Sequence, residues 1–191
     1  YEVTQAQFKE VMGSNPSSFS GVNMPVEMVT WSLAVEFCKE LTKQERNMDQ
    51  IPLGWTYHLP TEAQWEYACR AGTETSYSFG NKILPTDARW SDGKSPSQSS
   101  EVGRYPSNPW GFHDMHGNVW EWCSDWYGEY PSTVAIDPIG PTAGTKRVRR
   151  GGSWLNPAIL LRSAWRFESA PSDVYSYCLL YTSPSPRDSD S

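Results

Sequence analysis

Apolar residues recur at helical spacing in the first half of the chain. In residues 31–46 they return every three or four positions, while glutamate and lysine occupy the opposite face. Two shorter helices are predicted over residues 5–12 and 62–71. Each follows a threonine and carries a glutamine at its third position, which is the spacing of a capping box. Gly13 and Gly72 come after the last turns, where a left-handed residue often ends a helix.

Strand signals are short, and the clearer ones lie in the second half. Residues 146–150 alternate and run into two glycines, and residues 163–167 are interpreted as the last core strand. Residues 25–29 and 57–60 are predicted to be short extended pieces. Residues 73–108 are polar and lack periodicity, which is unusual inside a compact domain. We expect this stretch to be ordered by its aromatic residues: Tyr77, Phe79, Trp90 and Tyr105.

Residues 113–127 carry the strongest local signal of the chain. They place three tryptophans, a tyrosine and several polar side chains around the pair Gly117 and Asn118. Asparagine after glycine tolerates a left-handed backbone and can hydrogen bond to nearby backbone groups. Tryptophan adds a large apolar area and needs a partner for its N–H group. The sequence therefore predicts a tight corner that enters a buried element, with polar groups fixed among aromatic rings.

Size and charge restrict the class of protein. The chain has 191 residues, which is enough for one domain with a proper core, and its net charge is −6 without a long run of one sign. That balance argues against nucleic acid as a partner. No apolar stretch approaches the length of a membrane span. No signal peptide is visible, and because the chain opens at Tyr1 in the middle of a pattern, we interpret it as a fragment.

The four cysteines are scattered and form no CxxC pair, which favours free buried thiols over a metal cluster. They are Cys38, Cys69, Cys123 and Cys178.

The corner and several other motifs carry a resemblance to a known family. Gly-Asn-Val-Trp-Glu-Trp at residues 117–122, followed by Arg-Gly-Gly-Ser-Trp at 150–154, resembles the sulfatase-modifying-factor family, to which the formylglycine-generating enzyme belongs. Further matching motifs occur in the family's order, and together they cover residues 1–177. They lie at residues 3–8, 25–31, 59–68 and 162–166.

This resemblance implies an α+β, C-type-lectin-like fold with few short helices, an irregular twisted antiparallel sheet and long ordered loops. It also implies export or an envelope location in bacteria. The positions expected to hold this fold together are Asn118, Trp120, Trp122, Arg150, Gly151, Gly152, Arg162 and Arg166.

Calcium is the metal that the resemblance implies at the corner. By motif, the ligands would be main-chain carbonyls and one carboxylate, which are the hard oxygen donors that Ca²⁺ takes. These ligands are the carbonyls of His116, Gly117 and Val119 and the side chain of Glu121. The alternative is that Glu121 is a buried carboxylate paired with an arginine, because a buried charge needs a partner. The arginines considered are Arg150, Arg162 and Arg166.

Copper is not expected in this chain. The formylglycine-generating enzyme holds copper(I) with two cysteines five positions apart, and thiolates suit this soft ion. The corresponding positions here are Asn156 and Leu161, and neither side chain can replace a thiolate. The groove around residues 156–161 becomes apolar, which favours a surface that binds a protein or a small ligand.

Two enzymatic alternatives remain beside this binding module. One is an oxygen-dependent oxidoreductase of the formylglycine-generating type, which converts a sulfatase cysteine to formylglycine. The other is a non-haem iron enzyme that resembles sulfoxide synthases, with ligands in a missing domain. The histidines of this chain are His58, His113 and His116, and the last two are close enough in sequence to share one turn. Two ligands without a third are a weak signal for iron or zinc.

Three remaining features are interpreted more simply. The basic run at residues 146–150 is expected to be a strand with its charges in solvent and Arg150 turned inward. Asp125 could be a catalytic acid, but a helix-capping or ion-pair role is the more ordinary interpretation. Residues 178–191 resemble the translation of a sequencing adaptor, and we expect them to be non-native.

Overall fold

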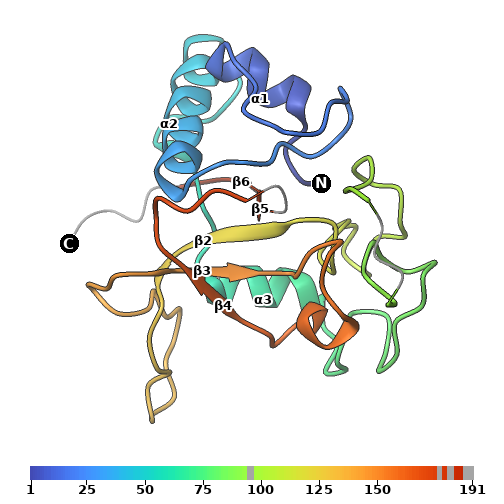
Figure 1. Ribbon diagram of the computed structural model, residues 1–191. Helices are drawn as coiled ribbons and strands as arrows, with labels where there is room; N and C mark the ends of the chain where they lie inside the picture. The colour runs from blue at the N-terminus through green and yellow to red at the C-terminus, as the bar shows by residue number, and fades with distance from the viewer. Residues whose placement is uncertain (94–96, 176–177, 180–182, 187–191) are drawn as a thin grey trace.

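The computed structural model describes residues 1–93, 97–175, 178–179 and 183–186, the last two stretches by their backbone alone (Figure 1). The α-helices lie in the first 70 residues, and the strands of the central sheet follow them. The elements in order are α1 (Gln5–Met12), α2 (Trp31–Asn47), β1 (Trp55–His58), α3 (Glu62–Arg70), β2 (Trp120–Trp126), β3 (Arg147–Arg150), the 3₁₀ helix η1 (Ala158–Leu161), β4 (Phe167–Ser169), β5 (Cys178–Leu179) and β6 (Ser183–Pro186).

The central sheet has the strand order β4-β3-β2-β5. Strand β3 is antiparallel to both of its neighbours, whereas β5 pairs with β2 in parallel. Glu121 lies opposite Arg150 and Trp122 opposite Arg149, and the register shifts before Trp126. A separate antiparallel pair joins β1 to β6. The fold is α+β with a small, mainly antiparallel sheet.

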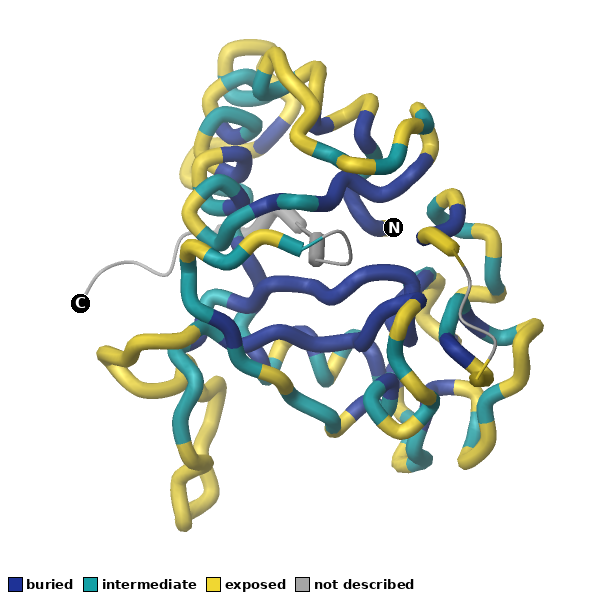
Figure 2. The backbone as a smooth tube through the Cα atoms, in the orientation of Figure 1, coloured by how far each residue is buried: buried dark blue, intermediate teal, exposed yellow. Residues whose placement is uncertain are grey.

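Strand β2 divides the core into two clusters because alternate side chains point to opposite faces. Trp120 and Trp122 pack toward α1 and α2, against residues such as Phe37. Cys123 lies on the other face, with Trp65 of α3 and Val148. Figure 2 shows β2 and β3 as the buried centre of the molecule between these helices. Fully burying one large apolar side chain contributes about 1.5–3 kcal/mol, so both faces of β2 stabilise the fold.

The helix ends confirm the capping predictions. The Thr4 hydroxyl accepts from the Gln7 N–H, while the Gln7 side chain accepts from the Thr4 N–H. Gly13 ends α1 with a φ of 75°. The second capping box, at the start of α3, has the same form. That helix ends at Ala71 with a φ of 46°, one residue before the glycine that the sequence suggested.

The prediction of a core strand over residues 163–167 is wrong. Strand β4 begins only at Phe167 and pairs with β3. Residues 163–166 form no strand, and the Ser163 carbonyl instead accepts a hydrogen bond from the buried Arg150 guanidinium. The Trp165 N–H then donates to the Arg162 carbonyl in a turn. The buried arginine has taken a carbonyl that a strand would have used.

Two long loops have opposite characters. In the stretch from 71 to 119, Tyr77 is buried and its hydroxyl donates to the Ala158 carbonyl at 2.8 Å, which supports the expected aromatic ordering. The loop between β2 and β3 instead extends away from the body of the molecule (Figures 1 and 2). Its side chains Val134 and Ile136 are 99% and 89% exposed. Among the described residues, no helix has the length and apolar character needed to cross a membrane.

Candidate functional site

Asn118 ties together segments that are far apart in sequence. Its backbone is left-handed, with a φ of 57°, and its side chain is buried. The side-chain oxygen accepts from the Ser100 N–H at 2.8 Å, and the amide nitrogen donates to the Glu2 carboxylate at 2.6 Å. The Asn118 carbonyl accepts from the Trp154 N–H at 2.8 Å. The predicted corner is therefore confirmed, and its asparagine satisfies groups from three other segments.

Glycines allow this corner to approach the chain after β3. The Gly117 N–H donates to the Gly151 carbonyl at 2.8 Å, and both residues have positive φ angles. A Cβ atom on Gly117 would lie 2.2 Å from the Arg89 carbonyl oxygen. A Cβ atom on Gly152 would lie 2.7 Å from the Leu161 side chain. Glycine is required here by both backbone angle and space.

The tryptophans of β2 are buried and partnered. Trp122 is fully enclosed, and its indole N–H donates to the Val29 carbonyl at 2.9 Å. Trp120 is also buried, with its ring 5.4 Å from that of Phe167. This arrangement fits the prediction that the corner leads into a buried element.

Glu121 is fully buried beside one hydrogen-bond donor. Its Oε2 atom accepts from the Trp65 indole N–H at 2.6 Å. The Oε1 atom has no hydrogen-bond partner in the described part of the chain. Burial raises the pKa of Glu121 to about 8. The alternative of an arginine partner is wrong here, because Arg150 and Arg166 pair with other carboxylates and Arg162 donates to the Ile159 carbonyl.

An unpartnered buried carboxylate oxygen fits a calcium ligand. The residues that would hold the ion are Glu121 and the carbonyls of His116, Gly117 and Val119. Within the described residues, no group of three or more His, Cys, Asp or Glu side chains could hold a metal. A cation at the corner would therefore depend on main-chain oxygens for most of its ligands, which Ca²⁺ accepts.

A buried ion-pair network lies under α3. The Glu62 carboxylate accepts from Arg150 at 2.9 Å and from Arg166 at 2.6 Å. Arg150 is fully buried and also pairs with Glu66. Arg166 faces the rings of Tyr127 and Tyr130, at 4.5 and 4.2 Å. Arg150 and Arg166 thus have the structural roles expected of them, while Arg162 lies over the Trp165 ring.

The basic run at 146–150 is less exposed than predicted. Arg149 is 2% exposed and lies among the aromatic rings on the α2 side of the sheet. Arg147 lies against the rings of Trp31 and Trp126, at 3.8 and 3.4 Å. Only Lys146 keeps an exposed ion pair, with Glu168. The expectation of solvated charges is wrong because the tryptophans of this fold provide surfaces for guanidinium groups.

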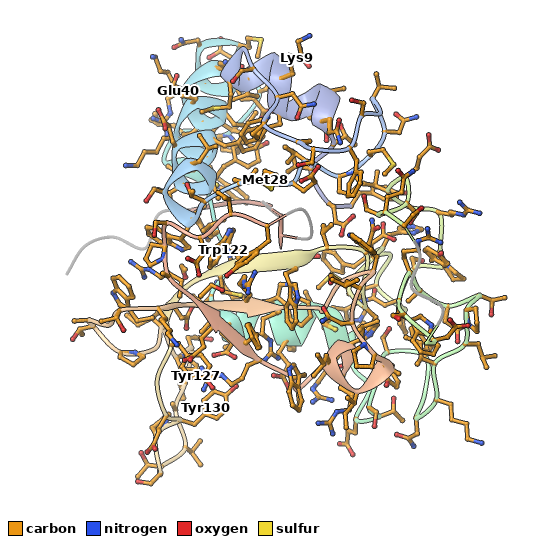
Figure 3. All side chains as sticks on the ribbon, in the orientation of Figure 1. Lys9, Met28, Glu40, Trp122, Tyr127 and Tyr130 are labelled. Atoms are coloured by element: carbon orange, nitrogen blue, oxygen red, sulfur yellow. The ribbon has the colours of Figure 1, made fainter. Side chains whose placement is uncertain are left out.

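A cavity of about 710 Å³ opens beside this network. Its walls come from one face of α3 along its whole length, the end of β2, the exposed loop and the segment before β4. Tyr127 and Tyr130 mark the base of that loop in Figure 3. Sequence reasoning missed this cavity and the central role of Glu62. One signal was available in the sequence, because the spacing of Glu62, Trp65 and Cys69 places them on one face of a helix. The structure shows that all three are buried.

A family model that matches most of the chain identifies the family to which it belongs. The profile of the sulfatase-modifying factor enzyme 1-like domain matches residues 1–177. The chain belongs to this family. The resemblance to the sulfatase-modifying-factor family, which the motifs indicated, is therefore confirmed.

Several proteins are similar to this sulfatase-modifying-factor domain. The chaperone protein LppX of Paenibacillus barcinonensis is 32% identical, over 82% of this chain and 68% of that protein. The mouse formylglycine-generating enzyme is 34% identical, over 80% of this chain but only 41% of the enzyme. Among solved structures, Treponema denticola variable protein 1 has a TM-score of 0.87 at 30% identity, covering 97% of this chain and 82% of that one. PvdO from Pseudomonas aeruginosa, at 24% identity and a TM-score of 0.79 over 94% of this chain and 76% of that one, shares the fold.

The two residues that the motif resemblance places at the copper positions, Asn156 and Leu161, have structural contacts in this chain. The Asn156 side-chain oxygen accepts from the Ser153 hydroxyl at 2.7 Å. Leu161 is fully buried against Gly117 and Gly152. Among the cysteines whose side chains the structure describes, Cys38, Cys69 and Cys123 are free and buried. Burial raises the pKa of Cys38 and Cys69 to about 12, so these thiols stay protonated.

The two neighbouring histidines of this family member do not converge on one ion. The His116 Nε2 atom accepts from the Ser78 N–H at 3.0 Å, so its Nδ1–H donates to the Leu161 carbonyl at 2.8 Å. Burial lowers the pKa of His116 to about 4, which keeps the ring neutral. His113 instead stacks on Tyr1, with its Nδ1 2.8 Å from the Tyr105 carbonyl. The imidazole of His116 is a structural group at the corner.

Proposed function

We propose that this sulfatase-modifying-factor domain is a binding module that does not generate formylglycine. The observation that carries the proposal is the pair of residues at the family's copper positions. Asn156 and Leu161 offer an amide and a buried alkyl group where copper(I) needs two thiolates. A fold shared with an enzyme does not bring its chemistry when the reacting groups are replaced.

The surface around residues 156–161 is the proposed binding face. Leu155 is 45% exposed and Ile159 is 55% exposed beside the former copper positions. Exposed apolar side chains grouped in this way are typical of surfaces that contact a protein or a small ligand. LppX, a relative that covers most of this chain, is named a chaperone, and that name supports a protein as the bound partner.

The competing function is oxidation of a sulfatase cysteine, which the likeness to the mouse formylglycine-generating enzyme favours. We expect no conversion when this domain is incubated with a cysteine-containing sulfatase peptide, copper(I), a thiol reductant and oxygen. Mass spectrometry of the peptide is the measurement, and the mouse enzyme under the same conditions is the positive control. Formylglycine above the level of a protein-free blank would overturn the proposal.

We also propose that the corner binds Ca²⁺ through Glu121 and neighbouring carbonyls. The support is the buried Glu121 oxygen without a hydrogen-bond partner. A ligand at a hundred times its Kd stabilises a fold by about 2.7 kcal/mol. For a domain of this size, this corresponds to a rise in melting temperature of roughly 5–10 °C.

We therefore expect millimolar Ca²⁺ to raise the melting temperature of the wild type but not that of Glu121→Gln. The glutamine keeps an acceptor for the Trp65 indole N–H and removes only the charge. Glu74→Gln is the matched control, since Glu74 is exposed and distant in sequence from the corner. Differential scanning calorimetry with Ca²⁺, Mg²⁺ and EDTA measures the shift. Equal shifts in the wild type and Glu121→Gln, or no shift in either, would exclude this site.

A further inference from the structure

The 710 Å³ cavity beside α3 has the size and lining of a small-molecule site. Pockets for such ligands usually measure roughly 300–1,000 Å³ and are mostly apolar with a few fixed polar groups. Aromatic, proline and isoleucine side chains form much of the wall here. They are Tyr67, Tyr130, Pro131, Pro138, Ile139 and Pro141. This cavity is separate from the surface around residues 156–161, since none of those residues lines it.

The arginines of the cavity floor are already occupied. Arg166 uses Nε and Nη2 on the Glu62 carboxylate, and its Nη1 donates to the Gly128 carbonyl at 2.6 Å. Both Glu62 oxygens accept from guanidinium groups, and Tyr130 donates to one of them. Arg70 pairs with Glu66. An anion entering the cavity would have to break these pairs, so the floor does not favour a negatively charged ligand.

Asp125 presents the free polar atom of this cavity. The residue is 4% exposed. Its Oδ2 accepts from the Glu62 N–H at 2.9 Å and from the Ser124 hydroxyl at 3.1 Å. In the described part of the chain, no other residue donates a hydrogen bond to Oδ1 and Asp125 forms no ion pair, although it lines the cavity. Burial raises the pKa of Asp125, and the negative charge of Glu62 adds to this rise.

Gly140 packs directly against this carboxylate. It lines the same cavity, and its φ of 72° is left-handed. A Cβ atom at this position would lie 3.1 Å from Asp125 Oδ1 and 3.2 Å from the Trp126 carbonyl oxygen. A side chain at residue 140 would therefore lie against Oδ1.

We propose that this cavity binds a primary ammonium group on an apolar stem, with Asp125 Oδ1 accepting from the ammonium. The carboxylate supplies the opposite charge, and Glu129 at the rim adds a second negative charge. The proline and isoleucine walls cover an alkyl chain. A free alkylamine and a lysine side chain of a protein partner share this chemistry.

The test is titration of the intact chain by isothermal calorimetry with n-pentylamine, n-pentanol and Nα-acetyl-lysine methylamide. We expect pentylamine to bind with a millimolar Kd and pentanol to bind at least tenfold more weakly, because it lacks the charge. Binding of the lysine derivative as tight as that of pentylamine assigns the site to a protein lysine. Binding of pentylamine alone assigns the site to a free amine.

Two variants test the role of Asp125 from different directions. Asp125→Asn removes the charge and should weaken pentylamine binding at least tenfold. Gly140→Ala keeps the charge but obstructs Oδ1, and it should have a similar effect. Gly111→Ala is the control for Gly140→Ala. Gly111 also has a positive φ, but no atom lies within 4 Å of the Cβ that the substitution would add. Circular dichroism verifies that each variant is folded.

Equal binding of pentylamine and pentanol, or unchanged pentylamine binding in both Asp125→Asn and Gly140→Ala, would overturn the proposal. No binding of pentylamine at about 10 mM, more than the expected Kd, would also overturn it. If Asp125→Asn does not fold, Gly140→Ala against Gly111→Ala still decides the question. None of these outcomes depends on whether the domain forms formylglycine.

Discussion

Gly117→Ala is expected to lower the free energy of unfolding by about 4 kcal/mol or to prevent folding. The left-handed backbone alone costs an alanine about 1–2 kcal/mol. The added Cβ would also lie 2.2 Å from the Arg89 carbonyl oxygen, which is backbone and cannot rotate away. The Asn118 N–H donates to that same carbonyl, so any shift disturbs the corner as well. Urea denaturation followed by tryptophan fluorescence measures the loss.

Gly111→Ala separates the two contributions to this loss. Gly111 has a φ of 85°, close to the 94° of Gly117, but nothing lies within 4 Å of its added Cβ. Its substitution should cost only the backbone term of about 1–2 kcal/mol. If the two variants unfold at the same urea concentration, the close approach of Gly117 to Arg89 is not what the corner depends on.

Glu62→Gln is expected to cost about 3–5 kcal/mol, because it leaves buried guanidinium groups without their shared carboxylate. Arg150 is fully buried, and Arg166 makes two of its hydrogen bonds to Glu62. The glutamine has a similar volume, so the change reports on charge and not on packing. Urea denaturation of both proteins measures the difference in the free energy of unfolding, with one shared m-value fitted to both curves.

Glu40→Gln is the matched control for Glu62→Gln. Glu40 pairs with Lys43 at 3.4 Å on the outer face of α2, where Figure 3 shows its side chain. Exposed pairs of this kind contribute less than about 1 kcal/mol. A loss for Glu62→Gln no larger than for Glu40→Gln would mean that the network under α3 does not stabilise the fold.

Local chemistry made part of this fold predictable. The boundaries of α1 follow from Thr4, Gln7 and Gly13, whose interactions span only a few residues. The corner at Asn118 was also predictable, because a Gly-Asn pair before alternating tryptophans has few other solutions. The expected exclusion of copper needed only the identities of Asn156 and Leu161 within a family pattern.

The remaining features depend on contacts that no local pattern contains. Glu62 lies in the first turn of α3, where local sequence indicates only a helix start, and its partners Arg150 and Arg166 lie 88 and 104 positions away. The absence of a strand at residues 163–166 follows from one of those arginines, which takes a carbonyl. The proximity of Asp125 and Gly140 results from the path of an exposed loop, whose composition predicts no conformation. The expectation that residues 178–191 are non-native stays a prediction, since it falls largely outside the described residues.

The partners of Asn118 also determine when this domain can mature during synthesis. Glu2 leaves the ribosome 116 residues before Asn118, and Trp154 must emerge before the last of these bonds can close. Until then the early helices lack the sheet on which they rest. Nascent chains of this kind stay open to chaperones and proteases until the segment that carries Trp154 has been made. Slowing the ribosome before the codon for Trp154 would prolong that exposure, whereas a pause after it would give the domain time to mature.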